Sequence, residues 1–136
     1  MMPTPTKSEQ CYTAMVIDDD EFSFENLRAK LRHMDVTTVI WANNGRAAIN
    51  MLDAMAKPPD LVICDIFMPE MDGIEFSEQL SMRRYQGHLI LMSGGDQSML
   101  QIAQHIAIAN RIKVLGAFSK PISMETLEGA LAFHLK

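Results

Sequence analysis

The chain lacks the features that would place it in a membrane or on a nucleic acid. None of its apolar runs reaches about 18 residues, the length that indicates a membrane-spanning helix. The first ten residues are polar and include Pro3 and Pro5, so we expect no secretory signal peptide. The net charge is -5 and no run is rich in lysine and arginine, which disfavours nucleic acid. We therefore expect a cytoplasmic protein with no direct membrane or nucleic-acid partner.

Cysteine and glycine motifs are also scarce. The two cysteines have no metal-ligand spacing, and we interpret Cys64 as a small buried apolar group and Cys11 as an incidental thiol. No G-x-G-x-x-G follows the first apolar run, which disfavours a flavin or dinucleotide site. The 136 residues show no repeat or linker and suit one hydrophobic core. We predict a disordered tail at 1–10 and one domain over 11–136.

Short apolar runs that end in reactive polar groups are what the chain does contain. Each run is short and apolar enough for a buried parallel strand. The runs are Val16-Ile17 before Asp18-Asp19, Leu61 to Cys64 before Asp65, Leu89 to Met92 before Ser93, and Val114 to Ser119 before Lys120-Pro121.

Strands and helices are predicted to alternate along this region. We expect strands at about 13–17, 37–41, 61–65, 88–92 and 113–118. Helices are expected at about 21–33, 46–55, 74–83 and 97–110, with a fifth that follows Pro121 and has Ser123 as its N-cap. This alternation is typical of an α/β fold with a parallel sheet, helices on both faces and right-handed crossovers.

The polar groups would meet in such a sheet, because ligands bind at the edge where parallel strands have their carboxyl ends. Asp18, Asp19 and Asp65 would repel one another there unless a cation is present. Mg²⁺ prefers oxygen ligands of this kind, and Lys120 supplies a further positive charge. Together with Ser93, these groups predict a site for a divalent cation and a phosphoryl group.

Four motifs carry a resemblance to a known family. They are Val16-Ile17-Asp18-Asp19-Asp20, the D-x-x-M-P-x-M-D-G run from Asp65 to Gly73, Ser93, and Lys120-Pro121. In this order and spacing they resemble the response-regulator receiver domain of two-component signalling, over nearly everything after residue 11. The resemblance implies a flavodoxin-like fold, with a doubly wound, five-stranded parallel sheet of strand order 2-1-3-4-5.

The resemblance also implies the chemistry of the acidic residues. Asp65 would accept a phosphoryl group from a phosphohistidine on a sensor histidine kinase or a histidine phosphotransfer protein. Asp18, Asp19, Asp65 and the backbone carbonyl of Phe67 would bind Mg²⁺.

The remaining site residues would respond to that modification. The resemblance implies that Ser93 hydrogen-bonds a phosphoryl oxygen and that Lys120 pairs with the phosphoryl group. The bond from Lys120 to Pro121 is usually cis in the family. Such a protein is a signalling switch that phosphorylates and dephosphorylates itself, turns over no metabolite, and controls an effector or a C-terminal output domain.

The chain departs from the family near the end of the fifth strand. Many receivers carry a switching tyrosine or phenylalanine three residues before the lysine, where this chain has Ala117. Phe118 follows with opposite strand parity, so we interpret it as a core residue. Phe67 and Gly95 occupy positions usually held to tune dephosphorylation in the family, and a bulky Phe67 predicts a phosphorylated lifetime of minutes or longer.

The fourth helix has more apolar residues than one buried stripe needs. Either the helix is well buried, or its outer side, with Leu100 and Ile108, meets an effector or forms a homodimer. The chain from Leu91 through this helix to Pro121 also resembles receivers fused to cyclic-di-GMP phosphodiesterase domains, although no such domain follows in this sequence.

Two other functions remain as alternatives. The first is an interaction module that has the receiver fold but is not controlled by phosphorylation. The second is a phosphohydrolase of the haloacid-dehalogenase type, a family that requires D-x-D at its nucleophile. In this chain Phe67 occupies the position of the second aspartate.

Gly73 is predicted to serve a turn with a positive φ.

Overall fold

The computed structural model describes residues 12–95 and 97–134, so the predicted tail at 1–10 and Cys11 lie outside the described residues. Within these ranges, five strands and five helices alternate. They are β1 (Thr13–Ile17), α1 (Glu21–His33), β2 (Thr38–Ala42), α2 (Gly45–Ala54), β3 (Leu61–Asp65), α3 (Gly73–Met82), β4 (His88–Ser93), α4 (Gln97–Ala109), β5 (Lys113–Ser119) and α5 (Met124–Leu131). The predicted elements are confirmed, and their boundaries differ from the observed ones by no more than one residue.

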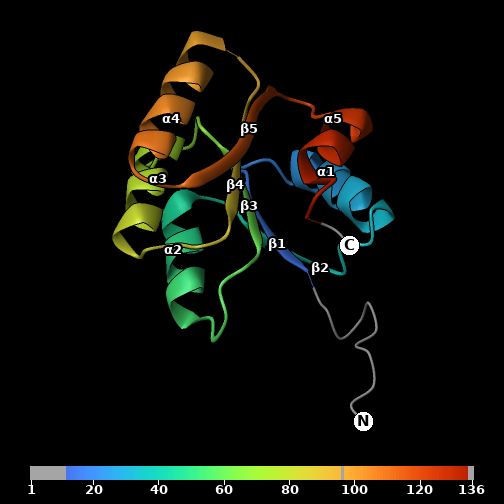
Figure 1. Cartoon of the computed structure of the whole chain (residues 1–136), viewed down its shortest axis with the longest axis horizontal. Coiled ribbons are helices and arrows are strands. Elements are labelled where there is room, and N and C mark those ends of the chain that lie inside the picture. The colour runs from blue at the N-terminus through green and yellow to red at the C-terminus, as the bar shows by residue number, and fades with distance from the viewer. Residues whose placement is uncertain (1–11, 96, 135–136) are drawn as a thin grey trace.

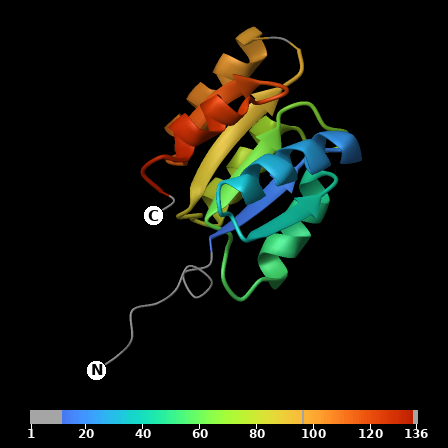
Figure 2. The ribbon, with the colours of Figure 1, turned by 90° about the vertical axis from the view of Figure 1, so that its right-hand side faces the viewer.

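The strands form a parallel sheet in the order β2-β1-β3-β4-β5, as the resemblance implied. Helices α2, α3 and α4 cover one face, and α1 and α5 cover the other (Figure 1). The view from the side shows α1 and α5 lying across the same face of the sheet (Figure 2). This arrangement follows from the right-handed crossover that joins each strand to the next parallel one.

Two apolar clusters, one on each side of the sheet, form the core. Met15 and Ile17 pack in the cluster on the α2–α4 side, whereas Ala14 and Val16 pack in the cluster on the α1–α5 side. This alternation is the two-residue period of a strand, here with both faces buried. All five residues of β3 are buried, which places its last residue, Asp65, at the end of the most enclosed strand.

Polar side chains cap the helices that follow the strands. Asp20 is the N-cap of α1, and its side chain accepts a hydrogen bond from the Phe22 N–H. Ser123 caps α5 as predicted, with its hydroxyl accepting from the Thr126 N–H at 3.1 Å. Because α1 begins directly after the Asp18-Asp19-Asp20 run, the acidic residues are confined to the short turn at the sheet edge.

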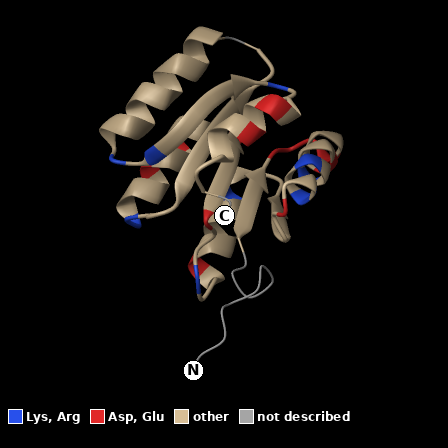
Figure 3. Ribbon diagram, turned by 45° about the vertical axis from the view of Figure 1, so that its right-hand side comes forward, with Lys and Arg blue, Asp and Glu red and all other residues tan. Residues whose placement is uncertain are grey.

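The predicted outer face of α4 is partly wrong. Leu100 is only 2% exposed and belongs to the core, whereas Ile108 is 52% exposed as expected. Ile102 is also exposed, and α4 carries no charged residue (Figure 3). The Leu100 side chain faces the core because it lies on the same side of the helix as Ala103 and Ala107, which are also buried. None of the described helices is both long and apolar enough to cross a bilayer.

Gly73 does not have the positive φ that was predicted, and no described glycine does. It begins α3 where the helix crosses close to the β3–α3 loop. A Cβ on Gly73 would lie 2.7 Å from the Cα of Ile66. The residue of this loop that adopts a positive φ is Glu70, at 71°. Gly73 is therefore needed for close backbone approach and not for its φ angle.

Candidate functional site

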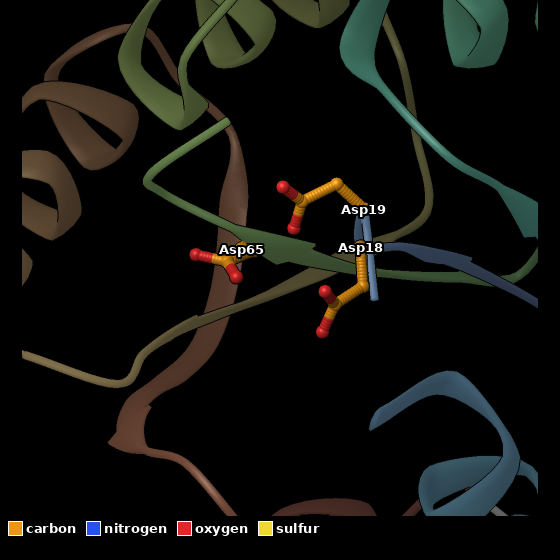
Figure 4. A group of neighbouring side chains, drawn as sticks. All are labelled: Asp18, Asp19 and Asp65. Atoms are coloured by element: carbon orange, nitrogen blue, oxygen red, sulfur yellow. The ribbon is translucent and has the colours of Figure 1, made fainter. Parts of the chain in front are cut away.

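The predicted site residues lie together at the carboxyl edge of the sheet. Asp18 and Asp19 follow β1, Asp65 ends β3, Ser93 ends β4, and Lys120 follows β5. The three acidic side chains lie beside one another at the ends of their strands (Figure 4). Four chain segments far apart in sequence meet here because parallel strands end at the same edge.

The three carboxyl groups are close enough to share one ion. One oxygen from each of Asp18, Asp19 and Asp65 lies within 4.8 Å of the other two. Asp18 is fully buried and Asp65 is 5% exposed, whereas Asp19 is exposed. Buried carboxylates in such proximity disfavour one another's ionisation unless positive charge is supplied.

Backbone turns fix the two buried carboxyl groups. The Asp18 Oδ1 accepts a hydrogen bond of 2.9 Å from the N–H of Asp20. The Asp65 Oδ1 accepts one of 2.9 Å from the N–H of Phe67. In both cases the donor lies two residues further along, the pattern of an aspartate that stabilises its own turn. One oxygen of each carboxyl group is thereby oriented by the main chain.

Lys120 bridges the other oxygens of these two groups. Its Nζ lies 2.9 Å from the Asp18 Oδ2 and 2.8 Å from the Asp65 Oδ2. The Lys120 N–H also donates to the Ser93 carbonyl at 2.8 Å, which ties the end of β5 to the end of β4. The Lys120–Pro121 bond is cis, as the resemblance implied.

Burial and neighbouring charges have opposite effects on the pKa values of Asp65 and Lys120. Burial raises the pKa of Asp65, and the nearby Asp18 carboxylate adds to this, although Lys120 and the Phe67 N–H oppose it. Burial alone would lower the pKa of Lys120, but its bonds to Asp18 and Asp65 outweigh burial and raise it above the ordinary value. The lysine therefore stays protonated, and any further positive charge in the pocket would stabilise the ionised carboxylates.

Ser93 is 1% exposed and its hydroxyl faces the loop that follows β4. The Ser93 Oγ accepts a hydrogen bond of 3.1 Å from the Gly95 N–H. A hydroxyl that accepts through a lone pair retains its own proton for donation. At the start of α4, the Gln97 Nε2 donates to the Ser119 Oγ, so the loop is also tied to β5.

The donor set fits a magnesium ion. Three carboxylates and one ammonium leave an excess of negative charge, and Mg²⁺ is bound by carboxylate oxygens together with water and phosphate oxygens. The Asp18 Oδ2 is buried and accepts no well-formed hydrogen bond, although it is paired with Lys120. A buried carboxylate oxygen with spare lone pairs, next to two other carboxylates, suits a hard cation.

One contact in the site was missed by sequence reasoning. The indole N–H of Trp41 donates to the Asp18 carbonyl at 2.8 Å. Trp41 precedes the last residue of β2, and nothing in the strand pattern indicated that its side chain reaches the acidic turn. At Phe67 the structure gives the N–H a partner in Asp65, and the role of its carbonyl in metal binding stays a prediction.

These features define a class: a doubly wound α/β protein with an acidic, lysine-containing pocket at the carboxyl edge of its sheet. The family model of the response regulator receiver domain matches residues 14–132, and the chain belongs to this family. Receiver domains are signalling switches and not metabolic enzymes. They bind Mg²⁺ at an acidic pocket and interact with histidine kinases and output domains.

Relatives of known name are similar over most of this chain. The positive alginate biosynthesis regulatory protein of Pseudomonas aeruginosa is 28% identical over 119 residues, which cover 86% of this chain and 44% of that protein. The signal transduction histidine-protein kinase BarA of Escherichia coli K12 is 28% identical over 136 aligned residues, 96% of this chain and 14% of the kinase. The chain thus spans less than half the length of these relatives.

Solved structures support the same fold. The crystal structure of a response regulator from Colwellia psychrerythraea is 29% identical, with a TM-score of 0.74, and the match covers 89% of this chain and 94% of that one. A probable two-component system response regulator/GGDEF domain protein is 26% identical with a TM-score of 0.73, over 90% of this chain and 48% of that one.

Proposed function

We propose that this chain is a phosphorylation-controlled switch in which Asp65 accepts a phosphoryl group from a phosphohistidine. The observation that carries the proposal is the pocket itself: Asp65 lies with Asp18 and Asp19 around one space and is paired with Lys120 at 2.8 Å. The donor would be a sensor histidine kinase or a histidine phosphotransfer protein.

In the transfer, an oxygen of the Asp65 carboxylate attacks the phosphorus atom. The new O–P bond forms as the P–N bond to the donor imidazole breaks, and the imidazole leaves with the bonding electron pair. When bound, Mg²⁺ would supply charge stabilisation for the transferring group, with Asp18, Asp19, Asp65 and the Phe67 carbonyl as its proposed ligands. Lys120 offsets the repulsion between the carboxylate and the phosphoryl oxygens, because it already contacts Asp65.

The product is an acyl phosphate, which gives Ser93 and Lys120 a new partner. The Ser93 hydroxyl donates its proton to a phosphoryl oxygen, and Lys120 pairs with the added charge. Both residues belong to segments joined by the 2.8 Å bond from the Lys120 N–H to the Ser93 carbonyl. Movement of Ser93 and Lys120 toward the phosphoryl group would therefore shift the ends of β4 and β5 together and change the position of α4.

A hollow next to the pocket suits a docking phosphodonor. It has a volume of about 310 Å³ and lies between the start of α1 and the β5–α5 loop, with Phe22, Leu27, Lys120 and Ile122 among its lining residues. Phe22 is 79% exposed at the edge of this hollow, so its ring is available for contact with a partner. A partner seated here would bring its phosphohistidine close to Lys120 and Asp65.

The output of the switch is an effector or a C-terminal output domain. The alginate regulatory protein and the response regulator/GGDEF domain protein are longer than this chain, which favours an output domain in those relatives. A homodimer through α4 is a second form of output, now with Ile102 and Ile108 as its exposed apolar residues in place of Leu100. Fusion to a cyclic-di-GMP phosphodiesterase domain stays a prediction from the sequence.

The decisive experiment treats the protein with Mg²⁺ and a small phosphodonor and measures intact mass. We expect a phosphoryl mass on the wild type that EDTA prevents. Asp65→Asn should gain none, whereas Asp53→Asn, the same substitution on the exposed surface of α2, should be phosphorylated normally. Trp41 fluorescence should change when beryllofluoride and Mg²⁺ are added to the wild type.

Two results would contradict the proposal. A wild type that is neither phosphorylated nor sensitive to beryllofluoride would favour the interaction module that works without phosphorylation. Sustained turnover of a phosphate ester would favour the phosphohydrolase. The rate of phosphate release also tests the predicted lifetime of minutes or longer, which a loss within seconds would contradict.

A further inference from the structure

Trp41 joins the main chain at Asp18 to strand β2. Its Nε1–H donates a hydrogen bond of 2.8 Å to the carbonyl oxygen of Asp18. On the other side of the same residue, the Asp18 N–H donates to the Ala42 carbonyl at 3.1 Å. The peptide groups before and after the Asp18 side chain are thus both bonded to the end of β2.

The indole replaces sheet pairing that stops just before the site. The register between β1 and β2 ends with Ile17 opposite Ala42, so Asp18 lies one residue beyond the paired strands. Asp18 is fully buried, and a buried carbonyl oxygen needs a donor. After Ala42 the chain leaves the strand through the bend at Asn43 and Asn44, and the Trp41 side chain provides the bond instead.

The indole is itself held in place by aromatic stacking. Its ring lies on Phe24 of α1 with centroids 5.2 Å apart and planes 13° from parallel. Trp41 also packs against the cluster on the α1–α5 side of the sheet. Offset stacking of this kind restricts a ring that would otherwise turn on its side-chain bonds. The donor is therefore presented to Asp18 from a fixed position.

We infer that Trp41 is a positioning residue for the metal site. Its N–H fixes the turn that presents Asp18 and Asp19 to the ion, so losing this donor lets both carboxylates shift from their places beside Asp65. The inference rests on the proposed function, since Mg²⁺ is the ion that these residues would bind. Residues that orient metal ligands from outside the ligand set commonly change metal affinity without contacting the metal.

Trp41→Phe tests the inference, because phenylalanine keeps an aromatic ring against Phe24 and removes the N–H donor. Mg²⁺ binding is measured on the whole chain by isothermal titration calorimetry, and folding by urea unfolding followed by circular dichroism. We expect Mg²⁺ to bind about tenfold more weakly, at the lower end of the range for such partners. Unfolding should remain a single cooperative transition.

Leu131→Ala is the control for general loosening, since it removes a buried side chain of α5 from the same apolar cluster and leaves both Trp41 and Phe24 in place. It should lower the urea midpoint but leave the Mg²⁺ affinity unchanged within a factor of about two. The inference is overturned if Trp41→Phe binds Mg²⁺ as tightly as the wild type, or if Leu131→Ala weakens binding equally, which would indicate general loosening. A wild type that binds no Mg²⁺ at all would instead overturn the proposed function.

Discussion

Replacing Gly73 with alanine should destabilise the protein, although alanine is the better helix former. The new Cβ would lie 2.7 Å from the backbone Cα of Ile66 and 3.0 Å from its Cγ2. Because the nearest atom belongs to the backbone, it cannot turn away as a side chain does. The Gly73 N–H also bonds to the Ile66 carbonyl at 3.0 Å, so separating the two segments weakens that bond as well.

The size of the effect follows from two opposing contributions. Overpacking of this kind costs about 1–3 kcal/mol, and the gain in helix propensity returns at most about 1 kcal/mol. The central values, about 2 kcal/mol for the cost and about 1 kcal/mol for the gain, leave an expected net loss of about 1 kcal/mol in the free energy of unfolding. At Gly129, inside α5, an added Cβ would meet nothing within 4 Å. The same substitution there should stabilise the protein by about 0.5–1 kcal/mol.

Urea unfolding of both variants, followed by Trp41 fluorescence and far-UV circular dichroism, gives the comparison directly. The opposite signs at the two glycines are the essential result. If Gly73→Ala is as stable as the wild type or more so, the close approach to Ile66 does not constrain the loop, and the role assigned to Gly73 is wrong. A destabilised variant should also be phosphorylated more slowly, because the displaced loop begins directly after Asp65.

Three further predictions concern burial, hydrogen bonding and pH. Leu100→Ala should cost about 2–5 kcal/mol, whereas Ile108→Ala should change the stability by less than about 0.5 kcal/mol; equal costs in urea unfolding would contradict the orientation of α4. Tyr85→Phe should cost about 1–2 kcal/mol, because the buried hydroxyl donates a 2.7 Å bond to a backbone carbonyl in the α2–β3 loop; an unchanged urea midpoint would count against that bond. Burial lowers the pKa of His88, and electrostatic repulsion from His134 and Lys113 lowers it further. The unfolded chain therefore binds more protons than the folded protein. Stability should fall as the pH drops below the ordinary histidine pKa of about 6.5. His88→Gln should flatten this dependence between pH 7.5 and 5.5, and an identical slope would refute the assignment.

The fold could be predicted closely from the sequence because its signals are local. Apolar runs of strand length alternate with helical periodicity, and capping residues such as Asp20 and Ser123 stand at the helix starts. The site could be predicted for a related reason. Parallel strands bring their carboxyl ends to one edge, so Asp18, Asp65 and Lys120 were expected to meet once the strands were assigned.

The errors concern which side chain faces which neighbour. The fourth helix has apolar residues on more than one side, so its sequence alone could not separate Leu100, which is buried, from Ile108, which is exposed. The role of Gly73 was predicted from conformational preference, whereas its actual constraint is a backbone contact with a different segment. Both outcomes depend on what lies opposite the residue.

The residues alone were enough to predict the order of strands and helices along the chain, the acidic and basic groups at the strand ends, and therefore the kind of site this protein has. How that site is supported depends on contacts between segments that are far apart in the chain. The Trp41 indole reaches a carbonyl 23 residues away, and Lys120 reaches a carboxylate 55 residues away. Such contacts leave no periodic signal, because the distance between two segments in space is set by the packing of the whole sheet and its helices and not by the residues next to them in the chain.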